Sequence, residues 1–272
     1  MAREAGMLKE YVAVSSASSQ TPVEFVASFW DQRWRGLRDN RRLQRLRQRE
    51  EYRFLKKAVR DFGNRPLDIL DCGCGQGGWT LLFHLEGHRA VGIDIAGATI
   101  RQLSAKHGEA FRFGDFHNIE CADNSYDVVI NWGGIEHFEE GPAQAILEAK
   151  RVLRPGGLFI ATTPCHNVRL FLRDALFGLG IGPAYPIEEH RFYQYRFSRA
   201  ELESYFRACG FAGVRSRIIH GAQGVDRSLD HELRWLGAWM PRLVRLGAMW
   251  LGGKLLRPFF GHMVICCGIK ET

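Results

Sequence analysis

A carboxylate followed by a cluster of glycines is the first feature of the sequence that can do chemistry. Asp71 ends an apolar run, LDILDC, and is followed by Gly73, Gly75 and Gly78, which satisfy the pattern G-x-G-x-x-G. Glycines at this spacing allow a tight turn and let a ligand approach the backbone without meeting a Cβ atom. Folds that bind dinucleotides share the pattern, so by itself it indicates a nucleoside-binding loop and leaves the ligand open.

Asp71 discriminates between two classes of ligand. A dinucleotide would place its pyrophosphate at the positive end of the following helix, where a carboxylate would repel it. S-adenosylmethionine carries an ammonium and a sulfonium and no phosphate, so the same carboxylate would attract it. Asp94 follows 23 residues after Asp71, at the end of the next apolar run, and suits a carboxylate that accepts hydrogen bonds from both ribose hydroxyls. The sequence therefore favours S-adenosylmethionine and argues against a nicotinamide dehydrogenase.

The elements that must position these residues alternate between strands and helices. Strands are expected at residues 67–72, 89–95, 110–115, 126–132, 158–164, 211–220 and 261–270. Gly108 would end one of the intervening helices, and Pro142 would begin another. The pattern predicts an α/β fold with a doubly wound, mostly parallel, seven-stranded sheet.

At this point the chain resembles a class I S-adenosylmethionine-dependent methyltransferase, which has a Rossmann-like fold. The matching stretches are LDILDCGCGQGG, VGIDIAGATI, GDF, DVVINWGGIEHFEE and LEAKRVLRPGGLFIATTP, within residues 66–164. Within that superfamily the chain is similar to the small-molecule and quinone-biosynthesis group. These motifs are specific for fold and cofactor and say little about the methyl acceptor.

The resemblance implies that ten positions line the cofactor. They are Asp71, Gly73, Gly75 and Gly77 for the methionine part, Asp94 and Ile95 for the ribose, Asp115 and Phe116 for the adenine, and Asn131 and Trp132 for the methyl-bearing sulfur. No metal is expected, because Cys72 and Cys74 lack a second pair of ligands and a zinc ion there would block the cofactor.

Three histidines are candidates for a catalytic base. His137 follows the fourth strand, and an imidazole with a pKa near neutrality suits proton removal from a phenol-like or enol-like acceptor. The alternative for His137 is a residue that shapes the pocket wall. His166 follows the fifth strand and His190 lies in the aromatic-basic run HRFYQYRF, from which either could reach the acceptor. We expect direct in-line displacement toward a small or lipid-linked acceptor, at oxygen before carbon and carbon before nitrogen.

The net charge of +7 comes from one N-terminal segment. Residues 31–60 hold twelve Lys and Arg against four Asp and Glu, a balance of +8. Residues 1–60 are therefore expected as a tail, poorly ordered over residues 1–21, and a basic amphipathic helix before a methyltransferase domain at 61–272. Five arginines form a basic stripe on this helix, namely Arg38, Arg41, Arg42, Arg45 and Arg49. The stripe is either a solvated face or a surface for a polyanion or membrane.

Two rival functions remain open. An RNA or protein methyltransferase could hold its substrate with the basic helix, although the charge lies upstream of the core, and Asn131-Trp132-Gly133-Gly134 departs from the motif of amino-methylating DNA enzymes. A non-catalytic binding protein could retain the cofactor fold as a scaffold. The intact Asp71 and Asp94 argue against that second rival.

Two insertions, residues 165–197 and 221–258, are expected over the carboxyl ends of the strands, where they would form the acceptor pocket. The second carries Leu and Trp at helical spacing between basic residues and is interpreted as a lid, a subunit interface or a peripheral membrane contact. Arg242 and Arg245 within it argue against a membrane-spanning helix. Seven scattered cysteines and no apolar leader segment indicate a cytoplasmic protein, peripheral to a membrane at most.

Overall fold

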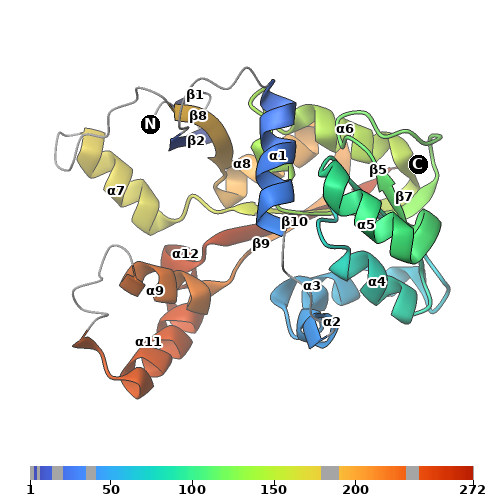
Figure 1. The fold of residues 1–272 in the computed structure, drawn as a ribbon. Coiled ribbons are helices and arrows are strands. Elements are labelled where there is room, and N and C mark those ends of the chain that lie inside the picture. Colours follow the sequence, from blue (N-terminus) through green and yellow to red (C-terminus); the bar gives the residue numbers. More distant parts are fainter. Residues whose placement is uncertain are drawn as a thin grey trace.

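A seven-stranded sheet forms the centre of the computed structural model, which describes residues 3–4, 7–13, 21–34, 41–178, 190–230 and 239–271 (Figure 1). The strand order is β5 (Phe111–Phe113), β4 (Arg89–Asp94), β3 (Asp68–Cys72), β6 (Tyr126–Trp132), β7 (Leu153–Pro164), β10 (Met263–Lys270) and β9 (Phe211–Ile219). The first five strands run parallel, and β10 is antiparallel to both of its neighbours. The predicted fold class, a mostly parallel seven-stranded sheet, is confirmed.

Helices cover both faces of the sheet, so the central strands are apolar on both sides. Val128 and Val129 are adjacent in β6 and are fully buried in two different hydrophobic clusters. One cluster is closed by α6 (Ala143–Val152) and α8 (Arg199–Ala208), and the other by α2 (Arg41–Leu46), α3 (Glu50–Ala58) and α4 (Gly78–Leu85). A strand buried on both faces reads as a continuous apolar run, which is why β6 was recognisable from sequence.

The N-terminal segment differs from the expectation of a disordered tail and one helix. The described residues of 22–58 form the helices α1 (Pro22–Trp34), α2 and α3, and a turn at residues 47–49 separates α2 from α3. The expectation of disorder is wrong for residues 3–4 and 7–13, which form β1 (Arg3–Glu4) and β2 (Met7–Ala13).

Both strands belong to a second, antiparallel sheet with β8 (His190–Arg196), the segment expected as an aromatic-basic loop. Glu10 of β2 accepts hydrogen bonds from the side chains of Gln194 and Arg196, the latter at 2.6 Å. Strand β8 lies far from β2 along the chain, so no local sequence pattern predicts that the two strands pair.

The two insertions are mostly helical, and the first also contains β8. The helices are α7 (Val168–Gly178), α9 (Gly221–Asp230), α11 (Arg242–Leu255) and α12 (Arg257–Phe260), and they lie on the same side of the molecule (Figure 1). A capping box precedes α8, because Ser198 and Glu201 each accept a hydrogen bond from the other's backbone N–H. Residues 179–189 of the first insertion and 231–238 of the second lie outside the described residues.

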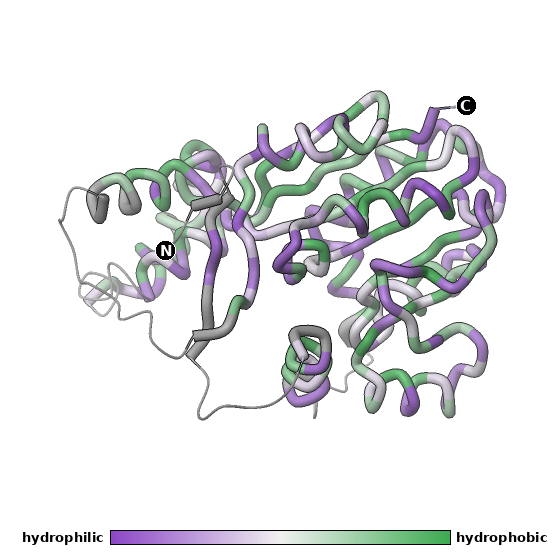
Figure 2. Tube along the Cα trace, turned by 90° about the horizontal axis from the view of Figure 1, so that it is seen from above, coloured by the Kyte–Doolittle hydropathy of each residue, from purple (hydrophilic) through white to green (hydrophobic). Residues whose placement is uncertain are grey.

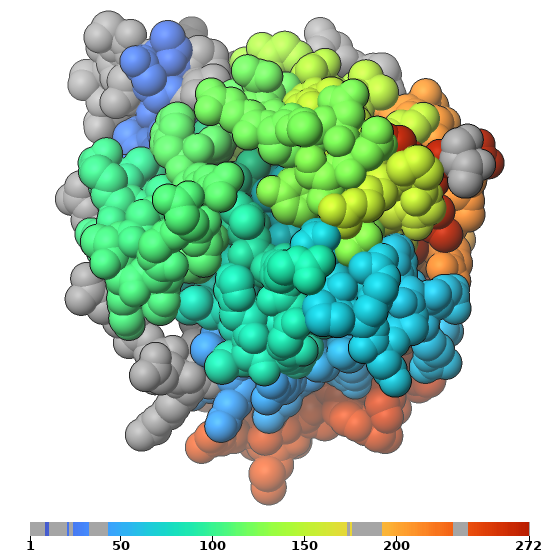
Figure 3. All heavy atoms as spheres, turned by 90° about the vertical axis from the view of Figure 1, so that its right-hand side faces the viewer, coloured from blue at the N-terminus to red at the C-terminus, as the bar shows by residue number. Residues whose placement is uncertain are grey.

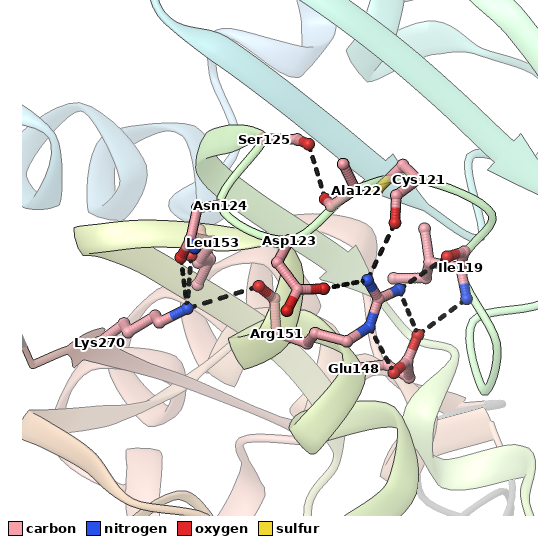
Figure 4. A network of polar contacts seen from close by, with 10 residues as sticks. All are labelled: Ile119, Cys121, Ala122, Asp123, Asn124, Ser125, Glu148, Arg151, Leu153 and Lys270. Carbon is pink, nitrogen blue, oxygen red and sulfur yellow. Dashed lines mark hydrogen bonds and ion pairs between the residues drawn. The ribbon is translucent and has the colours of Figure 1, made fainter.

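A polar network braces the loop that leads into β6 (Figure 4). Arg151 of α6 donates to the carbonyl oxygens of Ile119 and Cys121 at 2.7 and 2.9 Å, and binds the carboxylates of Glu148 and Asp123. The loop is thereby anchored to α6. The strand that follows it delivers side chains to the carboxyl end of the sheet, where the candidate site lies.

Candidate active site

A cleft opens at the carboxyl ends of β3, β4 and β6, and α1 contributes to its wall. Figures 1 and 2 show the backbone of α1 standing on one side of the sheet. The empty volume of the cleft is about 1130 Å³, including the part open to solvent. Its walls include eight of the ten positions predicted to line the cofactor, namely Asp71, Gly73, Gly75, Asp94, Ile95, Phe116, Asn131 and Trp132. His137 lines the same cleft. The carboxyl ends of neighbouring parallel strands meet at one edge, which brings these residues together.

Asp71 lies deeper than the mouth of the cleft and is fully buried. Its Oδ2 accepts hydrogen bonds from the backbone N–H and the hydroxyl of Thr80, at 3.1 and 2.7 Å. Its Oδ1 is buried and has no hydrogen-bond partner within the part of the chain that the structure describes. Burial raises the pKa of Asp71 to about 7. A carboxylate with one unsatisfied buried oxygen favours a cationic ligand, which would restore its charged form.

Asp71→Asn is expected to flatten the pH dependence of stability. The stability that this carboxyl contributes is present below its unfolded pKa of 3.8 and is lost as the pH rises to its folded value of about 7. Between pH 5.5 and 8.5 the free energy of unfolding of the wild-type protein should therefore fall by about 2 kcal/mol. The amide of the variant does not titrate, so the variant should not show this fall. Urea unfolding at both pH values measures this, and a difference between the two proteins that does not change with pH would contradict the buried carboxyl.

Asp94 holds the glycine loop while it lines the cleft. Its Oδ2 accepts from the backbone N–H of Gly75 and its Oδ1 from that of Ala96, each at 2.8 Å. Burial raises the pKa of Asp94, and the two backbone hydrogen bonds oppose that rise. Each carboxylate oxygen can accept more than one hydrogen bond, so ribose hydroxyls remain compatible with this arrangement.

Two predicted cofactor residues are not on the cleft wall. Gly77 precedes α4 with a φ of +71°, and a Cβ atom there would clash with the ring of Phe111, so this glycine is required for packing. The Oδ1 of Asp115 accepts from the backbone N–H of His117 at 2.8 Å and caps its own turn. Phe116, the next residue, is buried and lines the cleft. The adenine contact of Asp115 stays a prediction.

The end of β6 supplies one positioning residue and one unsatisfied donor. Asn131 donates to the carbonyl oxygen of Cys72 at 2.8 Å and accepts from the backbone N–H of Ile135 at 3.0 Å, so its amide ties β3 to the turn after β6. The ring of Trp132 lies 5.1 Å from that of Trp79. Among the described residues, the buried indole N–H of Trp132 finds no acceptor. The cleft therefore holds an orphaned donor besides the orphaned Oδ1 at the end of β3.

His137 ends the short helix η3 (Ile135–His137) and is buried. Its Nδ1 lies 2.7 Å from the carbonyl oxygen of Tyr193. Since a carbonyl only accepts, Nδ1 carries the proton and Nε2 of the neutral ring keeps its lone pair. Burial lowers the pKa of His137, which keeps the ring neutral near pH 7. This histidine has the tautomer and the location of a base.

Of the other two candidate bases, His166 lies away from the cleft wall, and His190 stays a prediction. The ring of His166 lies 6.2 Å from that of Phe171 in α7. His190 begins β8, and its side chain lies outside what the structure describes. Among the residues described, no group of three or more His, Cys, Asp or Glu is arranged to hold a metal ion.

Sequence reasoning missed the helix that walls the cleft. Val26 and Trp30 of α1 line it, and the rings of Trp30 and His137 are 5.4 Å apart. Asp31 secures α1 by accepting from the backbone N–H groups of Ala98 and Thr99 at the start of α5 (Gly97–His107). The aromatic periodicity of α1 signalled an apolar face but not which surface that face would cover.

Arg49, predicted as part of the basic stripe, is exposed and also lines the cleft. It is the only Lys or Arg among the described residues of the cleft wall. Arg45 of the same stripe is exposed in α2. Residue 38 and the side chains of residues 41 and 42 lie outside the described part, so the stripe itself stays a prediction.

Comparisons with known proteins agree with this geometry. A family described as a methyltransferase domain matches residues 70–161. A probable S-adenosylmethionine-dependent methyltransferase of Mycolicibacterium smegmatis is 36% identical over 179 residues, which cover 65% of each chain. A ubiquinone biosynthesis O-methyltransferase of Maricaulis maris is 28% identical over 154 residues, 52% of this chain and 60% of the relative. The chain thus spans somewhat less than two thirds of the length of these relatives.

A solved structure shows the same fold. The 1,6-didemethyltoxoflavin-N1-methyltransferase of Burkholderia thailandensis, with bound 1,6-didemethyltoxoflavin and S-adenosylhomocysteine, aligns with a TM-score of 0.54 at 19% identity. The alignment covers 97% of this chain and 96% of that chain. The matched family segment contains β4, β6 and the carboxyl end of β3, the strands whose ends build the cleft. Residues 70–161 thus match a methyltransferase-domain family, and by its motifs, its sheet and these relatives the chain is similar to class I S-adenosylmethionine-dependent methyltransferases.

Proposed function

We propose that this protein transfers the methyl group of S-adenosylmethionine to a small or lipid-linked acceptor, at oxygen in preference to carbon, and at carbon in preference to nitrogen. The observation that carries the proposal is the presence of His137 in the same cleft as Asp71 and Asp94. A base is needed when the nucleophile is a hydroxyl or an acidic carbon, and is needed less for an amine. The similarity to a ubiquinone biosynthesis O-methyltransferase supports oxygen.

The residues of the cleft fit the cofactor. The unsatisfied Oδ1 of Asp71 suits the ammonium of the methionine part, and Arg49 suits its carboxylate. Asp94 suits the ribose hydroxyls, and the ring of Phe116 suits a face of the adenine. When bound, S-adenosylmethionine supplies a methyl group whose bond to the positively charged sulfur breaks, leaving the electron pair on sulfur, as the acceptor atom bonds to the methyl carbon.

The protein's own residues prepare the acceptor. Nε2 of His137 takes the hydroxyl proton of the acceptor, and the Tyr193 carbonyl oxygen stabilises the resulting imidazolium through the hydrogen bond from Nδ1. The proton then passes to solvent. Val26, Trp30 and Phe138 form an apolar wall around this histidine, which excludes water and favours an acceptor with an apolar or aromatic body.

Native mass spectrometry followed by a transfer assay tests the proposal. The purified protein is first examined for copurified cofactor and apolar metabolites. It is then incubated with methyl-labelled S-adenosylmethionine and, separately, with 4-tert-butylcatechol, acetylacetone and dodecylamine. We expect label on a catechol oxygen. Transfer to the amine alone would overturn the preference for oxygen, and bound cofactor with no transfer to these probes or to a cell extract would favour a binding protein.

A further inference from the structure

Helix α11 presents its large apolar side chains to the outside of the molecule. Six apolar residues of the helix are each more than half exposed, and we call them together the outer face. They are Leu243, Val244, Leu246, Trp250, Leu251 and Leu255. Leu243 and Leu255 expose 81% and 71%. A surface helix normally turns such side chains toward the core. The outer face is therefore the reverse of the usual pattern.

The opposite side of α11 packs on α9 through small and polar residues. A Cβ atom on Gly221 of α9 would clash with the carbonyl oxygen of Gly253 in α11, so the two backbones are in direct contact. Arg245 donates to the carboxylates of Asp226 and Asp230 of α9, at 2.8 and 2.6 Å. The helix thus turns its polar and small residues to the protein and its apolar residues outward, as an amphipathic helix does when its outer side meets an apolar medium.

The charged residues of α11 and of its immediate flanks are all positive. Residues 239–258 contain four Lys and Arg and no Asp or Glu. Arg245 and Arg257 are paired with carboxylates, those of α9 and that of Glu50. Arg242 and Lys254 are exposed, and the Nζ of Lys254 lies 4.2 Å from the centroid of the Trp250 ring. A lysine whose stem follows an apolar surface while its ammonium reaches outward suits a headgroup phosphate.

We propose that the outer face docks on a membrane surface that contains anionic lipids, with α11 lying in the plane of the interface. Its 14 residues reach about 21 Å, less than the roughly 30 Å of a hydrocarbon core. Within the described ranges, no helix is both long and apolar enough to cross a bilayer. The inference concerns binding and stands independently of the proposed methyl transfer.

The position of α11 in the fold agrees with this role. It lies at the margin of the molecule, away from β5 (Figures 1 and 3). On the same side, α7 exposes Phe171 and Leu172 and contacts α12, the helix that follows α11 (Figure 1). Pairing of two outer faces would bring cations together without carboxylates on that face to neutralise them, which disfavours a second copy as the occupant.

Vesicle flotation of the full chain tests the proposal. The vesicles are phosphatidylcholine alone or phosphatidylcholine with about a third phosphatidylglycerol, a composition chosen to supply anionic charge. The test variant is Leu243→Ser with Trp250→Ser. The matched control is Leu85→Ser with Phe113→Ser, because these two apolar side chains are 67% and 68% exposed on other elements. Circular dichroism verifies that each variant is folded.

We expect the wild-type and control proteins to float with anionic vesicles and the test variant to bind them about tenfold or more weakly. Arg242→Gln with Lys254→Gln should weaken binding and reduce its dependence on salt. Failure of the wild-type protein to float, or equal flotation of test and control variants, would overturn the proposal. A dimer in lipid-free light scattering that only the test variant abolishes would also overturn it, in favour of a second copy.

Discussion

His137→Gln is expected to lower methyl-transfer turnover about 100-fold or more while cofactor affinity stays within about twofold, because a positioned base contributes about 10²–10⁴ to such a rate. The side chain lines the cleft and its Nδ1 is engaged by the Tyr193 carbonyl. Burial lowers the pKa of His137 from its ordinary value of 6.5. The wild-type rate should therefore fall only below about that pH, where Nε2 becomes protonated, and the variant should lack this acid limb.

Turnover measured across pH at saturating cofactor, together with calorimetry of S-adenosylhomocysteine binding, checks this result. His166→Gln is the matched control, because His166 follows the next strand and is not on the cleft wall. Its turnover should equal that of the wild type. A loss of turnover in the control with none in His137→Gln would move the base to the other histidine.

Asp94→Ala is expected to weaken cofactor binding about 100-fold or more. Two charge-assisted hydrogen bonds to ribose hydroxyls, at about 1.5 kcal/mol each, account for a factor of this size. The substitution also removes the acceptor for the backbone N–H groups of Gly75 and Ala96, which would loosen the glycine loop. Calorimetry with S-adenosylhomocysteine measures the affinity.

Asp68→Ala supplies the control for this second result. Asp68 begins the strand that carries Asp71, and its carboxylate binds Arg89 and Arg154 at 2.6 and 2.8 Å, away from the cleft. We expect a modest loss of thermal stability and unchanged affinity. Wild-type affinity in Asp94→Ala would remove this carboxylate from the cofactor site, and an equal loss in both variants would indicate general destabilisation.

Most of the polar side of the cleft was predictable from sequence. Asp71 and Asp94 follow short apolar runs, and the rule that parallel strands bind ligands at their carboxyl ends brings such residues together. The sequence was less informative about the form of each contact. It placed Asp71 at the end of a strand but did not show that this carboxyl is fully buried, because burial depends on Thr80 and the helix that packs above it.

The apolar wall of the cleft was not predictable. Val26 and Trp30 come from a helix that the sequence identified only as amphipathic, and its docking depends on Asp31 meeting the start of α5, 67 and 68 residues later. The sheet of β1, β2 and β8 depends in the same way on Glu10 meeting Arg196 across 186 residues. A local sequence pattern shows that a segment has an apolar face, but it does not identify the segment against which that face packs.

The sequence by itself thus determined the strands of the central sheet and the helices between them, the glycine loop and the carboxylates that favour a cationic nucleoside ligand, since each depends on a few neighbouring residues. Only the tertiary structure decided that α1 closes the cleft over His137, that Arg49 enters it, and that α11 turns its leucines away from the protein. These outcomes depend on which surfaces remain uncovered after the sheet has formed, and contacts between distant segments decide that.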